Sequence, residues 1–216
     1  MAKIANDKTQ SYFITFEGGE GSGKSTQIQM LADKLKKNNV PHITTREPGG
    51  TPESENIREL LMSGGKDRWD GVTELLLMSA ARREHCRKII WPALENSQWV
   101  LCDRFVDSTM AYQGYAHGTG RAAVEQIQNV VLHQFRPDLT IILDMPIDVG
   151  LKRAKARGKT TRFDNLDEQF HQSVRDAFLD IARREPNRCT VIDASGSMEA
   201  VHDAIWQVVT SRFAVT

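Results

Sequence analysis

A glycine-rich stretch in the chain ends in a lysine followed by two hydroxyl side chains. It matches the pattern G-x-x-x-x-G-K-[ST] and reads Gly18-Gly19-Glu20-Gly21-Ser22-Gly23-Lys24-Ser25-Thr26. In this pattern the backbone N–H groups surround a phosphate, the lysine reaches the β- and γ-phosphates, and the first hydroxyl helps to hold Mg²⁺. A chance glycine turn is the alternative, and the flanking elements distinguish the two.

The flanking residues favour the phosphate loop. Residues 12–16 form a short apolar run typical of a buried strand, and a helical face follows the loop at Ile28, Leu31, Ala32 and Leu35. A strand, a glycine turn and a helix N-terminus together form an anion site. The sequence therefore predicts a nucleoside triphosphate site over residues 18–26.

An acid and a base follow another apolar run at 99–102. An aspartate at such a strand end supports Mg²⁺ in P-loop proteins, so Asp103 joins Ser25 as a predicted metal ligand. The adjacent Arg104 could bind a second anion through its guanidinium. Asp144, after the run 139–143, is a competing candidate; we prefer Asp103 because of the arginine beside it.

Two further stretches offer groups for a second ligand. Arg46 opens the loop Arg46-Glu47-Pro48-Gly49-Gly50-Thr51-Pro52, where it could bind an anion or simply be a solvated arginine beside a tight turn. Residues 72–90 predict a long helix in which Met78 and Arg82 are neighbours on one face. This pair could cover and hydrogen-bond a planar base, or be a core methionine beside a surface arginine.

A dense basic cluster covers residues 151–159, with Arg162 just beyond it. Such clusters are usually solvated, and cations also suit a helix C-terminus. Phosphoryl transfer, however, needs cations around the transferring group, and residues 19–22 of the glycine loop contain no arginine. We therefore interpret residues 150–163 as an arginine-rich lid that excludes water, with Arg153 and Arg157 as its catalytic candidates.

The order of elements predicts the fold class. Apolar runs alternate with helical patterns, as in parallel α/β proteins, and lie at 12–16, 41–45, 99–102, 139–143 and 189–192. The expected architecture is a three-layer P-loop NTPase fold, with a five-stranded parallel sheet flanked by helices and a final helix over 198–213. Because no repeat or linker interrupts the pattern, residues 1–216 form one predicted domain, with about ten N-terminal residues as a flexible tail.

Composition narrows the function classes. The 28 basic and 28 acidic residues balance, which argues against nucleic acid or a membrane as a partner. Cys86, Cys102 and Cys189 show no C-x-x-C spacing, and the last two lie in apolar runs as small core residues. No run of about eighteen apolar residues or signal-peptide core is present, so we expect a cytoplasmic protein. The histidines form no cluster with metal-ligand spacing.

Taken together, these motifs resemble those of bacterial thymidylate kinases, P-loop enzymes that phosphorylate dTMP to dTDP with Mg·ATP. The resemblance runs from about Tyr12 to the C-terminus. The glycine loop is shared by many families, whereas Arg-Glu-Pro-Gly-Gly-Thr, Asp-Arg-Phe and Ala-Tyr-Gln-Gly are far more specific; the matching blocks are 16–26, 46–52, 75–82, 103–114 and 150–162. The resemblance implies the substrates ATP and dTMP, Mg²⁺ as cofactor and a homodimer.

The resemblance also implies a role for particular residues. By this resemblance, Arg46 and Arg104 bind the acceptor phosphate, and Arg58 assists them. The thymine contacts Arg82, Thr109 and Gln113 along its edge and Pro48 near its methyl group. The sugar lies near Tyr112, while Glu20 neighbours the 3′-hydroxyl and the phosphate end.

Two positions depart from the family pattern. At Met78 the family usually has a phenylalanine stacked on the thymine, so we expect weaker base binding or a looser pocket. An acidic Glu20 in the glycine loop resembles the bacterial class whose catalytic arginine lies in the lid. The lid lacks the aspartate that often precedes its last arginine, so Arg153, Arg157 and then Arg162 stay alternatives.

Other activities remain as alternatives. A deoxynucleoside kinase would need a carboxylate base for a neutral hydroxyl acceptor, and a broad-specificity pyrimidine monophosphate kinase would follow from a loose base pocket. A P-loop nucleotide switch would need an Asn-Lys-x-Asp motif to read guanine, which the sequence lacks.

Overall fold

The structure is a computed structural model that describes residues 10–65, 67–156, 158, 163 and 166–215. The predicted N-terminal tail and most of the later part of the predicted lid, including Arg157 and Arg162, lie outside these residues. Five strands agree with the five predicted apolar runs to within one or two residues: β1 (Phe13–Glu17), β2 (His42–Arg46), β3 (Trp99–Asp103), β4 (Leu139–Asp144) and β5 (Cys189–Asp193).

The five strands form one parallel sheet in the order β2-β3-β1-β4-β5. After β1 the chain forms the edge strand β2 and returns to place β3 between β2 and β1, and it then crosses to the other side of β1 for β4 and β5. In such sheets ligands bind beyond the carboxyl ends of the strands, where the strand order reverses. The register brings functional candidates together at this edge, because Asp103 pairs with Phe16 on one side and with Arg46 on the other.

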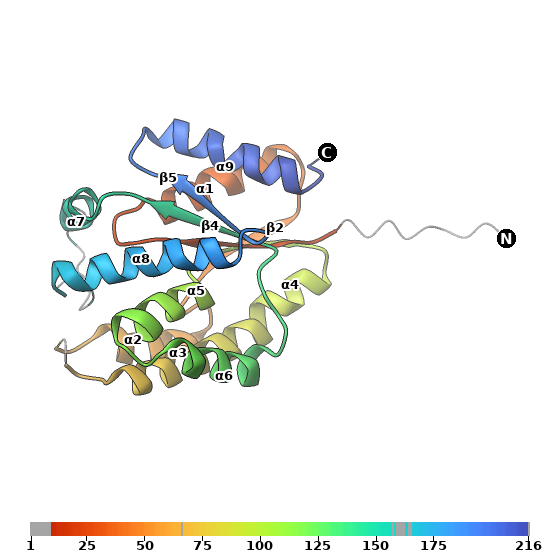
Figure 1. The fold of residues 1–216 in the computed structure, drawn as a ribbon. Helices are drawn as coiled ribbons and strands as arrows, with labels where there is room; N and C mark the ends of the chain where they lie inside the picture. Colours follow the sequence, from red (N-terminus) through yellow and green to blue (C-terminus); the bar gives the residue numbers. More distant parts are fainter. Residues whose placement is uncertain (1–9, 66, 157, 159–162, 164–165, 216) are drawn as a thin grey trace.

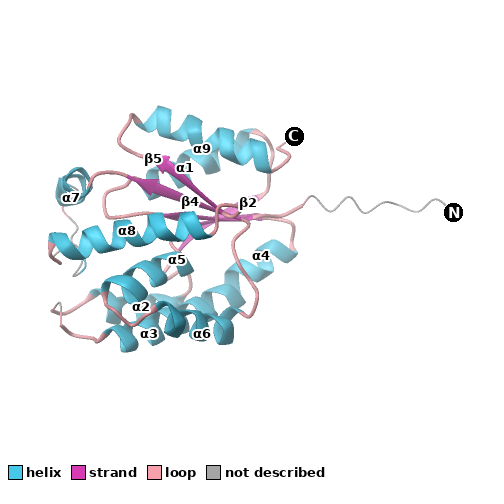
Figure 2. Cartoon of the chain, viewed as in Figure 1, coloured by secondary structure: helices cyan, strands magenta, loops and turns pink. Residues whose placement is uncertain are grey.

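Helices cover both faces of the sheet, as Figure 1 shows. Helices α1 and α9 lie on one face, and the remaining large helices lie on the other or at the carboxyl edge, coloured as helix in Figure 2. Their bounds are α1 Lys24–Lys37, α2 Pro52–Met62, α3 Gly71–His85, η1 Cys86–Ile90, α4 Trp91–Glu95, α5 Val106–Thr109, η2 Met110–Ala116, α6 Arg121–Leu132, α7 Ile147–Ala156, α8 Glu168–Arg184 and α9 Met198–Arg212. The three-layer α/β fold predicted from the sequence is confirmed.

Local sequence signals set several helix boundaries. Thr51 and Asp70 cap α2 and α3 by accepting hydrogen bonds from Ser54 N and Thr73 N. The predicted helix over 72–90 is helical throughout, but it changes to the π-helical segment η1 at Cys86. A π-helical turn changes the direction of side chains after it, which the apolar spacing did not indicate.

The core divides into two layers because successive strand residues point to opposite faces. Ile14 and Phe16 of β1 pack with residues of α1 and α9, whereas Phe13 packs with η1, Phe105 and Leu132. A third cluster joins Ile142 to α8 and η2. Helices thereby cover both faces of the sheet, and the carboxyl ends of the strands are left to form a site.

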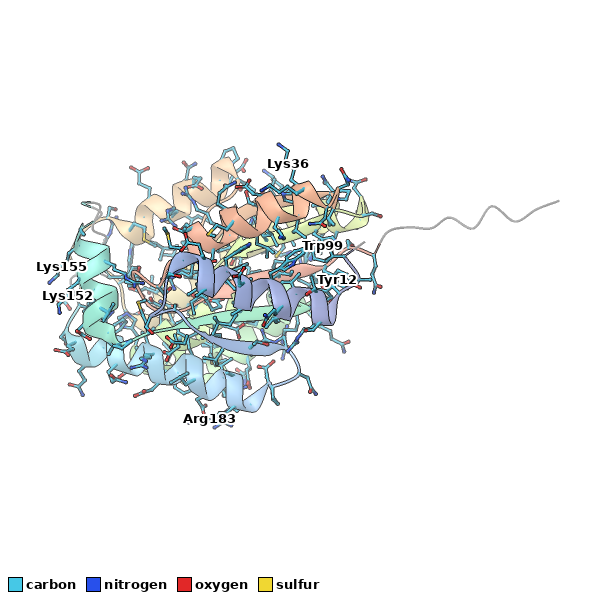
Figure 3. All side chains as sticks on the ribbon, turned by 90° about the horizontal axis from the view of Figure 1, so that it is seen from above. Tyr12, Lys36, Trp99, Lys152, Lys155 and Arg183 are labelled. Carbon is cyan, nitrogen blue, oxygen red and sulfur yellow. The ribbon has the colours of Figure 1, made fainter. Side chains whose placement is uncertain are left out.

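The two ends of the sheet differ in character. Tyr12 contacts Trp99 and Phe213, with ring centroids 4.9 and 3.9 Å away. Figure 3 shows Tyr12 and Trp99 far from α7, which carries Lys152 and Lys155. The aromatic cluster closes the amino end of the sheet, so the basic helix stands at the end where a ligand is expected.

Cys86, Cys102 and Cys189 are free and buried, in agreement with the interpretation of Cys102 and Cys189 as small core residues. Burial raises the pKa of Cys189 to about 12, so its thiol stays protonated at neutral pH. In the part of the chain that the structure describes, no helix has the length and apolar character needed to cross a membrane.

Candidate active site

A cleft of about 730 Å³ lies at the carboxyl edge of the sheet. We call it the cleft throughout. It is lined by the glycine loop, the loops after β2 and β3, and the cleft-facing side chains of α3 and η2. The predicted site residues that line it are Glu20, Gly21, Ser22, Gly23, Lys24, Ser25, Thr26, Arg46, Pro48, Arg58, Met78, Arg82, Asp103, Arg104, Thr109, Tyr112, Gln113 and Arg153.

The glycine loop is shaped by close backbone approaches. Gly18 has a φ of +135°, and a Cβ at this position would lie 2.4 Å from the carbonyl oxygen of Leu143. A Cβ at Gly21 would lie 2.0 Å from the carbonyl oxygen of Gly150. Gly18 and Gly19 are absent from the lining of the cleft and form the back of the loop. Only glycine fits at Gly18 and Gly21, so the loop can present its N–H groups instead of side chains.

Lys24 begins α1 and is buried in the loop. Its Nζ donates to Gly18 O at 3.1 Å and to Gly19 O at 3.0 Å. Burial, followed by the charge of Arg104, lowers the pKa of Lys24 to about 8. The ammonium is thus held at the helix N-terminus, where an incoming phosphate would meet both the lysine and the first free N–H groups.

The two candidate acids have different surroundings. Asp103 accepts a hydrogen bond from Ser25 Oγ at 2.7 Å beside the cleft. Asp144 is instead bound on both carboxylate oxygens by Arg175, at 2.7 and 2.8 Å. This geometry favours Asp103 over Asp144 as the acid that works with the glycine loop.

Arg104 occupies a turn immediately after β3. It is a non-glycine residue at a φ of +67°, a strained conformation for a residue with a Cβ. The buried Glu17 carboxylate fixes this turn by accepting from Phe105 N at 2.7 Å and from Ser108 Oγ at 2.5 Å. Ser108 Oγ in turn accepts from Arg104 Nη1 at 3.0 Å. Glu17 therefore holds the main chain directly after Arg104 and, through Ser108, the Arg104 side chain.

The acidic residue of the glycine loop binds this arginine directly. Arg104 Nη2 donates to Glu20 Oε1 at 2.7 Å, and Tyr112 Oη donates to the same oxygen at 3.0 Å. Burial acts to raise the pKa of Glu20, but the charges of Arg104 and Lys24 outweigh it and lower that pKa to about 2. Burial raises the pKa of Tyr112 well above its usual value, so its phenol stays a donor.

The loop after β2 forms the next part of the cleft wall. Arg58 Nη1 donates to Pro48 O at 2.9 Å, while Arg46 pairs with Glu55 at 3.0 Å and keeps more than half of its side chain exposed. Burial and the neighbouring charge of Arg46 lower the pKa of Arg58. The peptide bond before Pro48 is cis. Three arginines with like charge, Arg46, Arg58 and Arg104, thus line one side of the cleft.

The far wall carries Arg82 on α3. Its Nε donates to Glu47 Oε2 at 2.7 Å, and its Nη2 donates to Phe105 O and Thr109 Oγ1 at 3.0 and 2.9 Å. Met78, one turn earlier, also lines the cleft and packs against the core. The alternative of a surface arginine is excluded, since the Arg82 side chain is 2% exposed.

Several residues of the site were not predicted from the sequence. Glu47 and Ser108 hold arginines, and Glu74 holds Gln113 through a 2.9 Å hydrogen bond from Gln113 Nε2. Each is a polar residue beside a motif, a signal too general to select it. Residues from the last third of the chain also line the cleft, namely Phe163, Ala194, Gly196, Met198 and Val201. Among them, Ala194 O accepts a hydrogen bond from Arg153 Nη1 at 3.2 Å.

The fold and the site together define a P-loop nucleotide-binding protein whose cleft has the glycine loop on one wall and Arg82 with Met78 on another. Residues 16–205 match the family model described as thymidylate kinase. The chain therefore belongs to the thymidylate kinase family.

Individual relatives agree with this assignment. A thymidylate kinase of Caulobacter vibrioides is 53% identical over 94% of this chain and 98% of that relative. One of a Bradyrhizobium species is 50% identical over 93% of this chain and 90% of that relative. The crystal structure of thymidylate kinase from Ehrlichia chaffeensis is 39% identical, with a TM-score of 0.75 over 92% of this chain and 98% of the other.

Proposed function

We propose that this chain transfers the γ-phosphate of ATP to dTMP and forms dTDP and ADP. Family membership over residues 16–205 supports the reaction. The observation that carries the assignment of the acceptor is the position of Arg104, which faces the cleft next to the glycine loop and is held by Glu20 and Ser108. A fixed guanidinium beside a triphosphate loop suits a second phosphate.

The proposed reaction is a direct in-line displacement. An oxygen of the dTMP phosphate forms a bond to the γ-phosphorus of ATP while the bond to the β,γ-bridging oxygen breaks and ADP leaves. The acceptor is already an anion at neutral pH, so no general base is needed. Lys24 neutralises charge on the donor, and Arg104 and Arg46, with Arg58, screen the acceptor phosphate, which otherwise repels the γ-phosphate.

Ser25 and Asp103 would hold Mg²⁺. Both side chains offer oxygen atoms, which are the ligands that this ion prefers. The two oxygen atoms lie 2.7 Å apart in a hydrogen bond, close enough to share one ion. When bound, the ion would neutralise negative charge on the phosphates. The described residues contain no group of three or more His, Cys, Asp or Glu side chains that could hold a metal ion.

The remaining assignments follow the residues around the acceptor. Arg82, Thr109 and Gln113 would bind the thymine edge, Met78 would cover its face, Pro48 would lie near its methyl group, and Tyr112 would lie near the sugar. Arg153, and Arg157 outside the described residues, would supply lid cations to the triphosphate. A single domain, a homodimer and a cytoplasmic location complete the proposal.

The structure weighs against a deoxynucleoside kinase. That reaction needs a carboxylate that takes a proton from a hydroxyl. Glu20, which faces the cleft beside the proposed acceptor site, has its pKa lowered to about 2 by Arg104 and Lys24 against the effect of burial, and it accepts from Tyr112. A carboxylate of such low basicity is a poor general base.

A coupled ADP-release assay tests the proposal. The substrates are dTMP, dUMP, dCMP, dGMP and thymidine, each with Mg·ATP. We expect strong turnover with dTMP, weak turnover with dUMP and none with thymidine. Similar rates with several monophosphates would indicate a broad nucleotide kinase, and no turnover despite ATP binding would favour a nucleotide switch.

A further inference from the structure

Arg82 and Gln113, which line the cleft together with Met78, each have a buried polar side-chain atom without a hydrogen-bond partner. These atoms are Nη1 of Arg82, which is a donor, and Oε1 of Gln113, which is an acceptor. Oε1 of Gln27, a third such atom among the described residues that line the cleft, belongs to α1 behind the glycine loop. Buried polar atoms are nearly always paired, so an unpaired donor and acceptor in one cleft indicate a ligand with the complementary pattern.

The free atom of Arg82 is determined by its other contacts. Glu47 takes Nε, and Phe105 O and Thr109 Oγ1 take Nη2. The guanidinium cannot rotate without breaking these three hydrogen bonds. Nη1 therefore remains a fixed donor.

The free atom of Gln113 is determined by Glu74. Gln113 Nε2 donates to Glu74 Oε2 at 2.9 Å, and Glu74 is fully buried on α3. An ionised carboxylate only accepts, so it selects the amide rotamer that turns the NH₂ group toward it. The backbone is fixed as well, because Thr119 Oγ1 donates to Gln113 O at 2.6 Å.

We infer that Glu74 is a positioning residue for base specificity: it locks the Gln113 amide so that the cleft accepts a pyrimidine with an N3–H and a 4-oxo group and rejects a 4-amino pyrimidine. This inference rests on the proposed function. Arg82 Nη1 would donate to O4 and Gln113 Oε1 would accept from N3–H. A cytosine ring has a donor at N4 and an acceptor at N3. The Arg82 donor would then face the N4 donor and the Gln113 acceptor would face the N3 acceptor, so neither hydrogen bond could form.

A histidine also lies beside Glu74. His117 Nε2 lies 3.4 Å from Glu74 Oε2, the oxygen that also binds Gln113. Met78 follows Glu74 by one helical turn and lines the cleft, whereas Glu74 does not line it. Glu74 thus acts on the ligand only through Gln113.

The test compares the E74Q variant with the unmodified protein. The glutamine introduced by E74Q has an NH₂ group that can donate to Gln113 Oε1, so the Gln113 amide can then rotate. The substrates are dTMP, 5-methyl-dCMP and dUMP: the first two differ only at the N3 and C4 edge, and the first and third only at the 5-methyl group. We expect the ratio of kcat/KM for dTMP over 5-methyl-dCMP to fall by about tenfold or more, as for exchange of a hydrogen bond.

The dTMP over dUMP ratio should change by less than about twofold, because Glu74 has no role at the methyl group in this account. If Glu74 had a purely structural role, E74Q would lower kcat/KM for all three substrates by the same factor. The matched control is E17Q, which changes another fully buried glutamate that supports Arg104. E17Q should reduce turnover of dTMP and 5-methyl-dCMP by the same factor.

A second variant, Q113L, tests the route through Gln113 without depending on the folding of E74Q, and an unchanged ratio in Q113L would also overturn the inference. Q113L removes the oriented amide and should reduce the same ratio, and E74Q added to Q113L should reduce it no further. An unchanged ratio in a folded E74Q, or an additional loss in the double variant, would overturn the inference. If the unmodified protein does not use dTMP, the proposed function fails instead, so the two failures are distinguishable.

Discussion

Arg104 Nη2 lies 2.7 Å from Glu20 Oε1, so the arginine that follows β3 is bound by the acid of the glycine loop. The pair joins the two halves of the cleft, because one partner belongs to the triphosphate loop and the other to the proposed acceptor side. Both side chains are largely buried, at 17% and 19% exposure. A charge pair with little solvent is well suited to holding a guanidinium in one orientation.

We expect R104A to lower kcat/KM for dTMP by about 10²–10³-fold, the usual loss for one donor that stabilises developing charge. The affinity for ATP, measured by titration, should change little, because the glycine loop and Lys24 are intact. R104K is the control: it keeps the charge but loses the fork that binds Glu20 and Ser108 together, so it should recover only part of the activity. Equal loss of ATP affinity in R104A would contradict the assigned role.

Lys24 should make ATP binding depend on pH. Burial and the charge of Arg104 lower its pKa to about 8, so in the free protein the ammonium is present below that pH and is lost above it. We expect ATP affinity, measured without Mg²⁺, to fall as the pH rises from about 7 through about 9. K24R should bind ATP with no such slope over this range, because a guanidinium stays charged. A flat profile for the unmodified protein would refute this prediction.

The sequence was sufficient to predict the order and approximate bounds of the strands. Strand 13–17, the glycine loop and the helix after it are adjacent in the chain, so local patterns predicted them. In the structure Asp103 lies beside Ser25 in the cleft and Arg175 binds Asp144, while the metal role of Asp103 stays a prediction. Arg175 lies 31 residues from Asp144 in the chain, and no sequence pattern indicated that the two would pair.

Support between distant residues was not predictable. Glu17 contacts Ser108 across 91 positions and Glu47 contacts Arg82 across 35. Each contact depends on the sheet register and on a loop conformation, and a buried glutamate looks like any other glutamate in a sequence. Arg157 and Arg162 lie outside the described residues, so their place in the lid stays a prediction.

Ionisation of the buried Glu17 should lower the free energy of unfolding of the protein as the pH rises. Burial, and then the charge of Asp107, raises its pKa from 4.5 to about 7. Between these values the folded state binds more protons than the unfolded state, so the free energy of unfolding falls with rising pH. Relative to E17Q, which does not titrate, we expect the unmodified protein to lose on the order of 1–3 kcal/mol between about pH 4.5 and about pH 8 in urea unfolding. Parallel stability curves for the two proteins would contradict this.

Met78 offers a gain-of-affinity variant. The methionine lines the cleft one turn before Arg82, where the proposed thymine face would lie. M78F should bind dTMP about two- to twelvefold more tightly, since an aromatic pair contributes about 0.5–1.5 kcal/mol beyond area burial. M78L, similar in volume but without a ring, is the control and should not tighten binding. A dTMP affinity that is unchanged or weaker in a stably folded M78F would place the base elsewhere.

Asp103 should set the Mg²⁺ requirement of the reaction. Its carboxylate accepts from Ser25 Oγ at 2.7 Å and lies in the cleft, so D103N removes a negative charge next to the proposed ion while keeping a similar shape. We expect the Mg²⁺ concentration for half-maximal ADP release to rise by about tenfold or more, the usual effect of losing a supporting carboxylate. D144N is the matched control, because Asp144 ends the adjacent strand on the other side of β1 and pairs with Arg175 on α8. It should lower the unfolding temperature and leave the Mg²⁺ requirement unchanged; a larger Mg²⁺ effect in D144N than in D103N would exchange the roles of the two acids.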